Sequence, residues 1–152
     1  MSENKLLSGS NPNIRVSFVC ITMGHYKMAV QLLIDFRRLN LNISSQIFCS
    51  GLLRDQKNTF CSDHINSFDE SIFINEFQYV PVGSNVWKLR GLIKDVEKKF
   101  VNFRPDIIIT FTDNSYIYQH SFRFLKAKRN TKVVLFHEGY GDYSEAAASL
   151  RT

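Results

Sequence analysis

Short apolar runs without a polar face constrain this chain more than any other feature. Ile14–Thr22 is β-branched and apolar on both alternating sets of positions, and Ile107–Phe111 is the most apolar run in the chain. A strand of this kind is buried on both faces, which occurs in parallel sheets because crossover connections cover both sides with helices. The two runs predict an α/β fold, and we expect residues 107–111 to lie at the centre of the sheet.

Amphipathic helices are predicted between such strands, where apolar residues recur at spacings of three and four: 26–39, 85–102 and 116–128. Further strands are predicted at short apolar runs: 44–50, 77–82 and 131–136. Residues 52–75 have no clean period and receive no assignment. The alternation predicts one Rossmann-like domain, with a parallel sheet of about five strands and helices on both faces.

The length of 152 residues fits one domain of ordinary size. We expect a flexible leader at 1–13, the Rossmann-like domain at 14–143, and at 144–152 a tail or the truncated start of a linker. The leader contains no apolar core of a secretory signal, and the three cysteines have no CxxC spacing. These features predict a cytoplasmic protein.

The net charge of +5 favours acidic partners, and nucleic acid, anionic lipid headgroups and phosphorylated small molecules all fit its sign. No RNP-like, KH or zinc pattern occurs in the sequence, so nucleic-acid binding is not expected. HExxH and paired cysteines are absent too, which argues against a zinc site.

Ligands of open parallel sheets gather at the carboxyl ends of the strands, where three loops contain candidate residues. The first loop contains Gly24, which permits close approach of the backbone to a ligand, and His25, for which helix capping and substrate contact are both open. The second contains Asp113 and Asn114; helix capping by Asp113 or Ser115 is favoured over ligand contact there. Neither GxGxxG nor GxxxxGK[ST] is present, which disfavours dinucleotide and P-loop chemistry.

The third loop follows the last strand and concentrates ionisable and aromatic groups around two glycines, as His137-Glu138-Gly139-Tyr140-Gly141-Asp142-Tyr143. This stretch resembles a motif of the bacterial sialyltransferases and polysialyltransferases that build capsules and lipooligosaccharides. Those families carry two acidic residues and then Gly, usually after a strand of the N-terminal Rossmann-like half, often continuing as Gly-x-Gly-x-Tyr. Here the second acidic position is kept as Glu138, and the first is His137.

The resemblance implies one lobe of a GT-B glycosyltransferase, the acceptor-side half of an inverting enzyme. It makes His137 or Glu138 the expected base for the acceptor hydroxyl. The expected substrate contacts are Gly24, His25, Asp113 and Asn114 of the first two loops and Gly139 and Tyr140 of the third. The donor would be an activated nucleotide sugar such as CMP-sialic acid, without a metal. The implied partners are an acceptor glycan, a second Rossmann-like lobe or subunit carrying the His-Pro motif absent here, and the inner membrane through peripheral association.

Two alternatives remain open. A non-catalytic partner subunit would be similar to the small two-chain N-acetylglucosaminyltransferases, whose Gly-Gly-His faintly resembles Gly24-His25. A flavodoxin-like binding module is the second alternative. Receiver domains of that class carry acidic residues after the first strand, where this chain has Thr22-Met23-Gly24.

Overall fold

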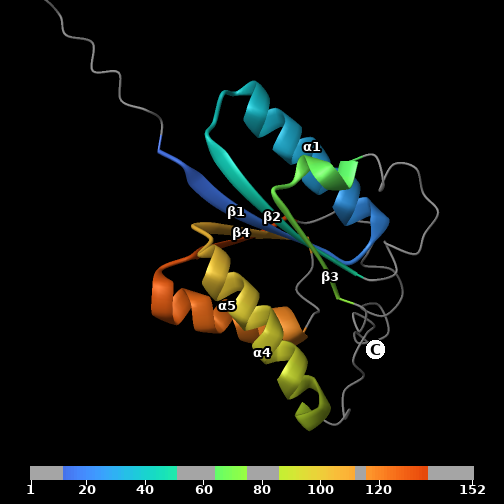
Figure 1. Cartoon of the computed structure of the whole chain (residues 1–152), viewed down its shortest axis with the longest axis vertical. Coiled ribbons are helices and arrows are strands. Elements are labelled where there is room, and N and C mark those ends of the chain that lie inside the picture. Colours follow the sequence, from blue (N-terminus) through green and yellow to red (C-terminus); the bar gives the residue numbers. More distant parts are fainter. Residues whose placement is uncertain (1–11, 51–63, 75–85, 112–115, 137–152) are drawn as a thin grey trace, which may run out of the picture.

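The structure, a computed structural model, describes residues 12–50, 64–74, 86–111 and 116–136. The described elements are β1 (Ile14–Cys20), α1 (Met23–Arg38), β2 (Ile43–Ser50), the 3-10 helix η1 (Ile65–Ser67), β3 (Glu70–Ile74), α4 (Val86–Phe103), β4 (Ile107–Thr110), α5 (Tyr116–Arg129) and β5 (Lys132–Leu135). All five strands pair in parallel in one sheet of order β3-β2-β1-β4-β5 (Figure 1). The prediction of a Rossmann-like α/β domain is confirmed.

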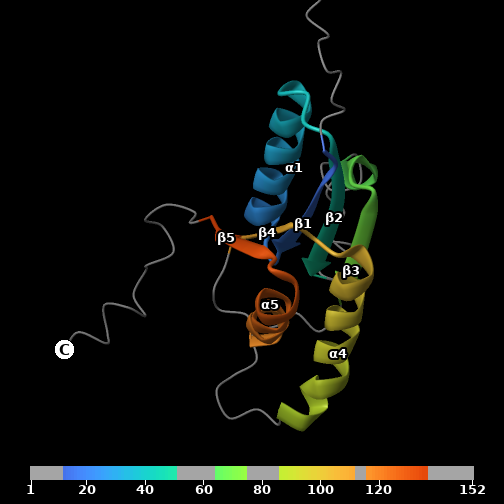
Figure 2. The same ribbon diagram turned by 90° about the vertical axis from the view of Figure 1, so that its left-hand side faces the viewer.

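Helices cover both faces of the sheet, as the doubly apolar strands predict. Figure 2 shows α1 on one side and α4 and α5 on the other. Phe18 packs under α1, whereas its neighbour Val19 packs under α4 and α5, and both side chains are fully buried. Successive strand residues point to opposite faces, so a strand covered on both sides carries apolar residues on both alternating sets of positions.

Two details of the predicted sheet are corrected. The third strand is Glu70–Ile74, within the stretch that received no assignment, and residues 77–82 lie outside the described residues. The middle strand is β1, and β4 lies between β1 and β5. β3 begins with the polar residues Glu70 and Ser71, so its sequence does not have the pattern of a buried strand. An edge strand tolerates such residues because it is only partly covered.

Polar side chains at the amino edge of the sheet hold the strands together. The Asp69 carboxylate accepts hydrogen bonds from the Ser45 backbone N–H at 2.7 Å and the Ser45 hydroxyl at 3.0 Å. The Asp106 carboxylate accepts the Arg15 backbone N–H at 2.8 Å, and Thr131 donates to the Pro105 carbonyl. These polar groups therefore serve the fold.

A row of hydrogen-bonded polar side chains crosses three strands beneath α4. The fully buried Ser17 hydroxyl donates to Gln46 Oε1 at 2.8 Å, and Gln46 Nε2 donates to Glu70 Oε2 at the same distance. The three residues are opposite one another in the strand register. Because a slip of one strand would leave buried polar atoms unpaired, this row favours the observed register.

Candidate functional site

The carboxyl edge between β1 and β4 is the position at which the chain connections diverge. From β1 the chain passes through α1 to β2, and from β4 it passes through α5 to β5 on the other side of the sheet. The two helices cover opposite faces, as Figure 1 shows, so their starts lie on either side of this edge. Such a switch point is where open parallel sheets bind ligands.

The first turn of α1 is held in a capping box at this edge. The Thr22 hydroxyl accepts the backbone N–H of His25 at 3.3 Å, and His25 Nδ1 accepts the backbone N–H of Thr22 at 3.5 Å. His25 Nδ1 also accepts the backbone N–H of Ile21 at 3.2 Å. The helix therefore begins at Met23, three residues before the predicted start at Tyr26, because the cap extends it toward the strand.

His25 is buried and lies across the switch point. Its exposed fraction is 4%, and its ring stacks on Phe111, directly after β4, with the centroids 5.6 Å apart and an interplanar angle of 23°. An Nδ1 that accepts backbone hydrogen bonds carries no proton, so the neutral ring has its N–H at Nε2. The sequence left two roles open for His25. The structure shows that the buried side chain caps the helix, and contact with a substrate stays a prediction.

Backbone amides are the groups at this turn that suit an anion. The cap uses the N–H groups of Thr22 and His25, and the N–H of Tyr26 bonds to the Thr22 carbonyl at 3.1 Å. The N–H groups of Met23 and Gly24 have no hydrogen-bond acceptor within the part of the chain that the structure describes. Gly24 is exposed and has no Cβ, so a ligand can approach both amides, and the positive end of the helix dipole favours a negative charge there.

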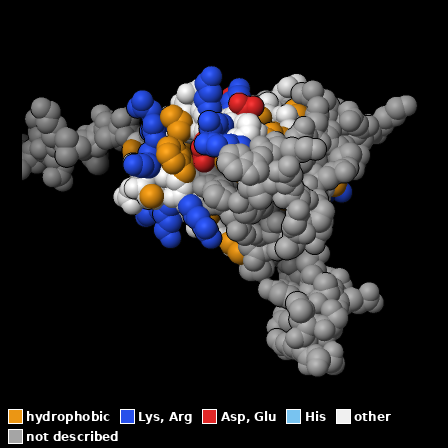
Figure 3. Space-filling view, turned by 90° about the horizontal axis from the view of Figure 1, so that it is seen from below, with side chains coloured by type: hydrophobic (Ala, Val, Ile, Leu, Met, Phe, Trp, Pro, Cys, Tyr) orange, Lys and Arg blue, Asp and Glu red, His pale blue; other side chains and the backbone are white. Residues whose placement is uncertain are grey.

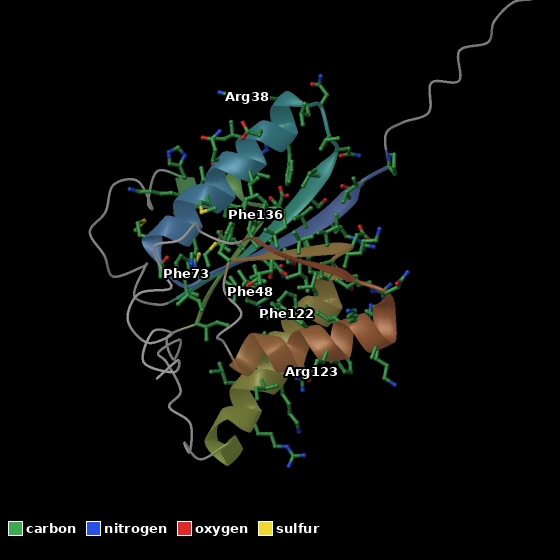
Figure 4. All side chains as sticks on the ribbon, turned by 180° about the vertical axis from the view of Figure 1, so that it is seen from behind. Arg38, Phe48, Phe73, Phe122, Arg123 and Phe136 are labelled. Carbon is green, nitrogen blue, oxygen red and sulfur yellow. The ribbon has the colours of Figure 1, made fainter. Side chains whose placement is uncertain are left out.

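The predicted site residues are only partly described. Gly24 and His25 lie together at the start of α1, whereas Asp113, Asn114, His137, Glu138, Gly139 and Tyr140 lie outside the described residues. The structure brings together the ends of β4 and β5: the rings of Phe111 and Phe136 are 6.1 Å apart. Figure 4 shows Phe136 on the same side of the sheet as α1. β4 and β5 are neighbouring strands, and residues 112–115 and 137–143, which follow them in sequence, lie outside the described residues.

Thr22 and Phe111 are two contributors that the sequence analysis did not assign to the site. Thr22-Met23-Gly24-His25 has the spacing of a capping box, with His at the position usually held by Glu or Gln, so the pattern contained this signal. Phe111 was assigned to a strand, and nothing local in the sequence marks its contact with a residue 86 positions earlier. That contact depends on β1 and β4 being neighbours.

No metal cluster and no membrane-spanning candidate accompanies this site. In residues 12–50, 64–74, 86–111 and 116–136, no group of three or more His, Cys, Asp or Glu residues is placed to hold a metal ion. No helix of those same ranges is long and apolar enough to cross a bilayer. Comparison with protein families, with curated proteins and with solved structures found no match to this chain.

Proposed function

We propose that this chain is a Rossmann-like lobe of a glycosyltransferase and that it binds a sugar substrate at the carboxyl edge between β1 and β4. The observation that carries the proposal is the start of α1 at the switch point, where Gly24 is exposed and the amides of Met23 and Gly24 have no acceptor among the described residues. Sialic acids and nucleotide sugars are anionic, so either suits a helix N-terminus. The sialyltransferase-like motif makes an acceptor glycan the proposed ligand of this lobe.

The proposed reaction is inverting transfer to the acceptor. His137 or Glu138 takes the proton of the acceptor hydroxyl, the oxygen forms a bond with the anomeric carbon, and the bond from that carbon to the phosphate of the donor breaks with both electrons leaving on the nucleotide. His137 and Glu138 directly follow Phe136 in sequence, and the ring of Phe136 is 6.1 Å from that of Phe111 after β4. This order along the chain supports the proposal of a base at the carboxyl edge. A donor such as CMP-sialic acid would be held by a second lobe.

The test is a titration of the ¹⁵N-labelled chain with a sialylated oligosaccharide and, separately, with CMP. We expect the oligosaccharide to shift the amide signals of Thr22, Met23, Gly24 and Phe111. Gly24→Asp should abolish the shifts, because a carboxylate at this exposed position repels an anionic ligand while it suits the helix dipole and preserves the helix.

The matched control is Gly91→Asp, the same substitution at an exposed position of α4 where an added Cβ would meet nothing within 4 Å. It should leave the shifts unchanged. The proposed site would be rejected if neither the oligosaccharide nor CMP shifts the amide signals at the start of α1. It would also be rejected if Gly24→Asp and Gly91→Asp reduce the shifts equally.

A non-catalytic partner subunit is the second candidate, and the exposure of the α1-side face of β5 favours it. Val134 and Phe136 are each 42% exposed there, although apolar residues of a parallel strand are normally covered. A second lobe or subunit would cover them. Glycan binding without any transfer by this chain alone would support the partner role, and transfer by this chain alone would contradict it.

A further inference from the structure

The positive charge of the described chain is concentrated on one layer of the fold. On α4 and α5, the side chains described include two acidic residues, Asp95 and Glu97, and eight exposed basic ones: Arg90, Lys94, Lys98, Lys99, Arg123, Lys126, Lys128 and Arg129. On α1 three basic residues, Lys27, Arg37 and Arg38, accompany Asp35, and Arg38 pairs with that carboxylate at 3.6 Å. The two covered faces of the sheet therefore differ strongly in charge.

Apolar side chains are exposed beside these charges. Phe124 on α5 is 38% exposed, and Val133 and Leu135 of β5 are 36% and 38% exposed. The register pairs Val133 with Ile108, which packs under α4 and α5, so both β5 side chains point to the α5 side of the sheet. Figure 3, viewed from below, shows apolar side chains with Lys and Arg gathered around them.

The geometry of α5 places Phe124 toward the β5 edge. Phe122 contacts Phe100 of α4 with ring centroids 6.1 Å apart, and Leu125 is fully buried against the sheet. Phe124 is two residues from Phe122 and so lies on the flank of α5 that faces away from α4. Figure 4 shows Arg123 on the outer side of the same helix. Basic and apolar side chains thus share one continuous surface.

We propose that this surface, formed by α4, α5 and the outer edge of β5 and called here the α4–α5 face, docks on the anionic surface of a phospholipid bilayer. The basic side chains bind the headgroups, and Phe124, Val133 and Leu135 enter the interface between headgroups and acyl chains. Docking by this face does not depend on the identity of the ligand at the carboxyl edge.

Exposed aliphatic side chains favour a lipid surface over a nucleic acid. Phosphate groups of either partner would satisfy Lys and Arg, but Val133 and Leu135 have no flat ring on which a base can stack. A bilayer interface accepts aliphatic and aromatic side chains alike. Docking through the α4–α5 face also leaves the carboxyl edge at the side of the layer, where the start of α1 stays open to solvent.

The experiment measures flotation of the full chain with vesicles of phosphatidylcholine alone and of equal parts phosphatidylcholine and phosphatidylglycerol. We expect binding to the mixed vesicles only, and weaker binding as salt rises. Each Lys or Arg near an anionic surface contributes about fivefold to partitioning. Lys126→Gln with Lys128→Gln should therefore weaken binding about 25-fold, and Phe124→Ser should weaken it independently of salt.

Lys27→Gln with Arg38→Gln is the matched control, because it removes the same net charge from α1 on the opposite face. Circular dichroism checks that every variant is folded. The proposal is overturned if the mixed vesicles do not bind, if the α1 pair costs as much binding as the α5 pair, or if a single-stranded oligonucleotide binds more tightly than the vesicles at the same salt.

Discussion

Substitutions at His25 separate the two contacts by which this residue connects the start of α1 to β4. His25→Asn keeps a side-chain acceptor at the δ position, so the backbone N–H groups of Ile21 and Thr22 retain their partner while the stacking on Phe111 is lost. His25→Phe keeps a ring against Phe111 and removes the acceptor. His25→Ala removes both contacts.

The expected magnitudes follow from the geometry. The cap bonds at 3.2 and 3.5 Å are long, so their loss in the Phe variant should cost about 1 kcal/mol. A stacked pair of rings contributes roughly 0.5–1.5 kcal/mol beyond burial, which sets the cost in the Asn variant. The Ala variant also leaves a cavity at a site that is 4% exposed, and its loss should reach about 2–3 kcal/mol.

Urea unfolding followed by circular dichroism measures these differences, and the ring ¹⁵N signals report the Nε2–H tautomer in the unmodified chain. A Phe variant as stable as the unmodified protein would show that the two hydrogen bonds accepted by His25 Nδ1 contribute nothing to stability. An Asn variant with full stability would reject the contribution of the stacking. Glycan binding that survives in His25→Asn would assign His25 to positioning the turn and not to contacting the ligand.

Three other predictions concern the framework around this edge. Gln46→Leu should lower the free energy of unfolding, measured in urea, by about 1–3 kcal/mol, because the buried Ser17 hydroxyl loses its acceptor. Adding Ser17→Ala should recover part of that loss, and equal stability of the single and double variants would contradict a stabilising role of the Ser17–Gln46 hydrogen bond. Gly91→Ala should raise the free energy of unfolding by about 0.5–1 kcal/mol, since the position is helical and an added Cβ meets nothing within 4 Å. A melting temperature below that of the unmodified protein would contradict this expectation. Asp69→Ala should lower the free energy of unfolding by about 1–2 kcal/mol, because the backbone N–H and the hydroxyl of Ser45 lose their acceptor. Hydrogen exchange should then accelerate first between β2 and β3, and unchanged exchange there would contradict the role of Asp69.

The sequence by itself determined the fold class, because the property involved is local. Ile14–Cys20 and Ile107–Thr110 carry apolar residues on both alternating sets of positions, which is typical of a strand covered on both faces. The periods of three and four located the three long helices within the described residues, with differences only at their ends. Cys20 and Cys49 are buried, which fits a thiol within an apolar run behaving as a small hydrophobic group.

The tertiary structure decided the order of the strands and therefore the site. Glu70–Ile74 is a strand through its backbone pairing with β2. The side-chain bonds of Asp69 with Ser45 and of Glu70 with Gln46 join the same two segments, and each pair is 24 residues apart in sequence. β5 is as apolar as an inner strand but lies at the edge, since nothing local specifies its neighbour. His25 meets Phe111 only because β1 and β4 are adjacent, and a contact between distant segments depends on the packing of the whole sheet, which no short pattern encodes.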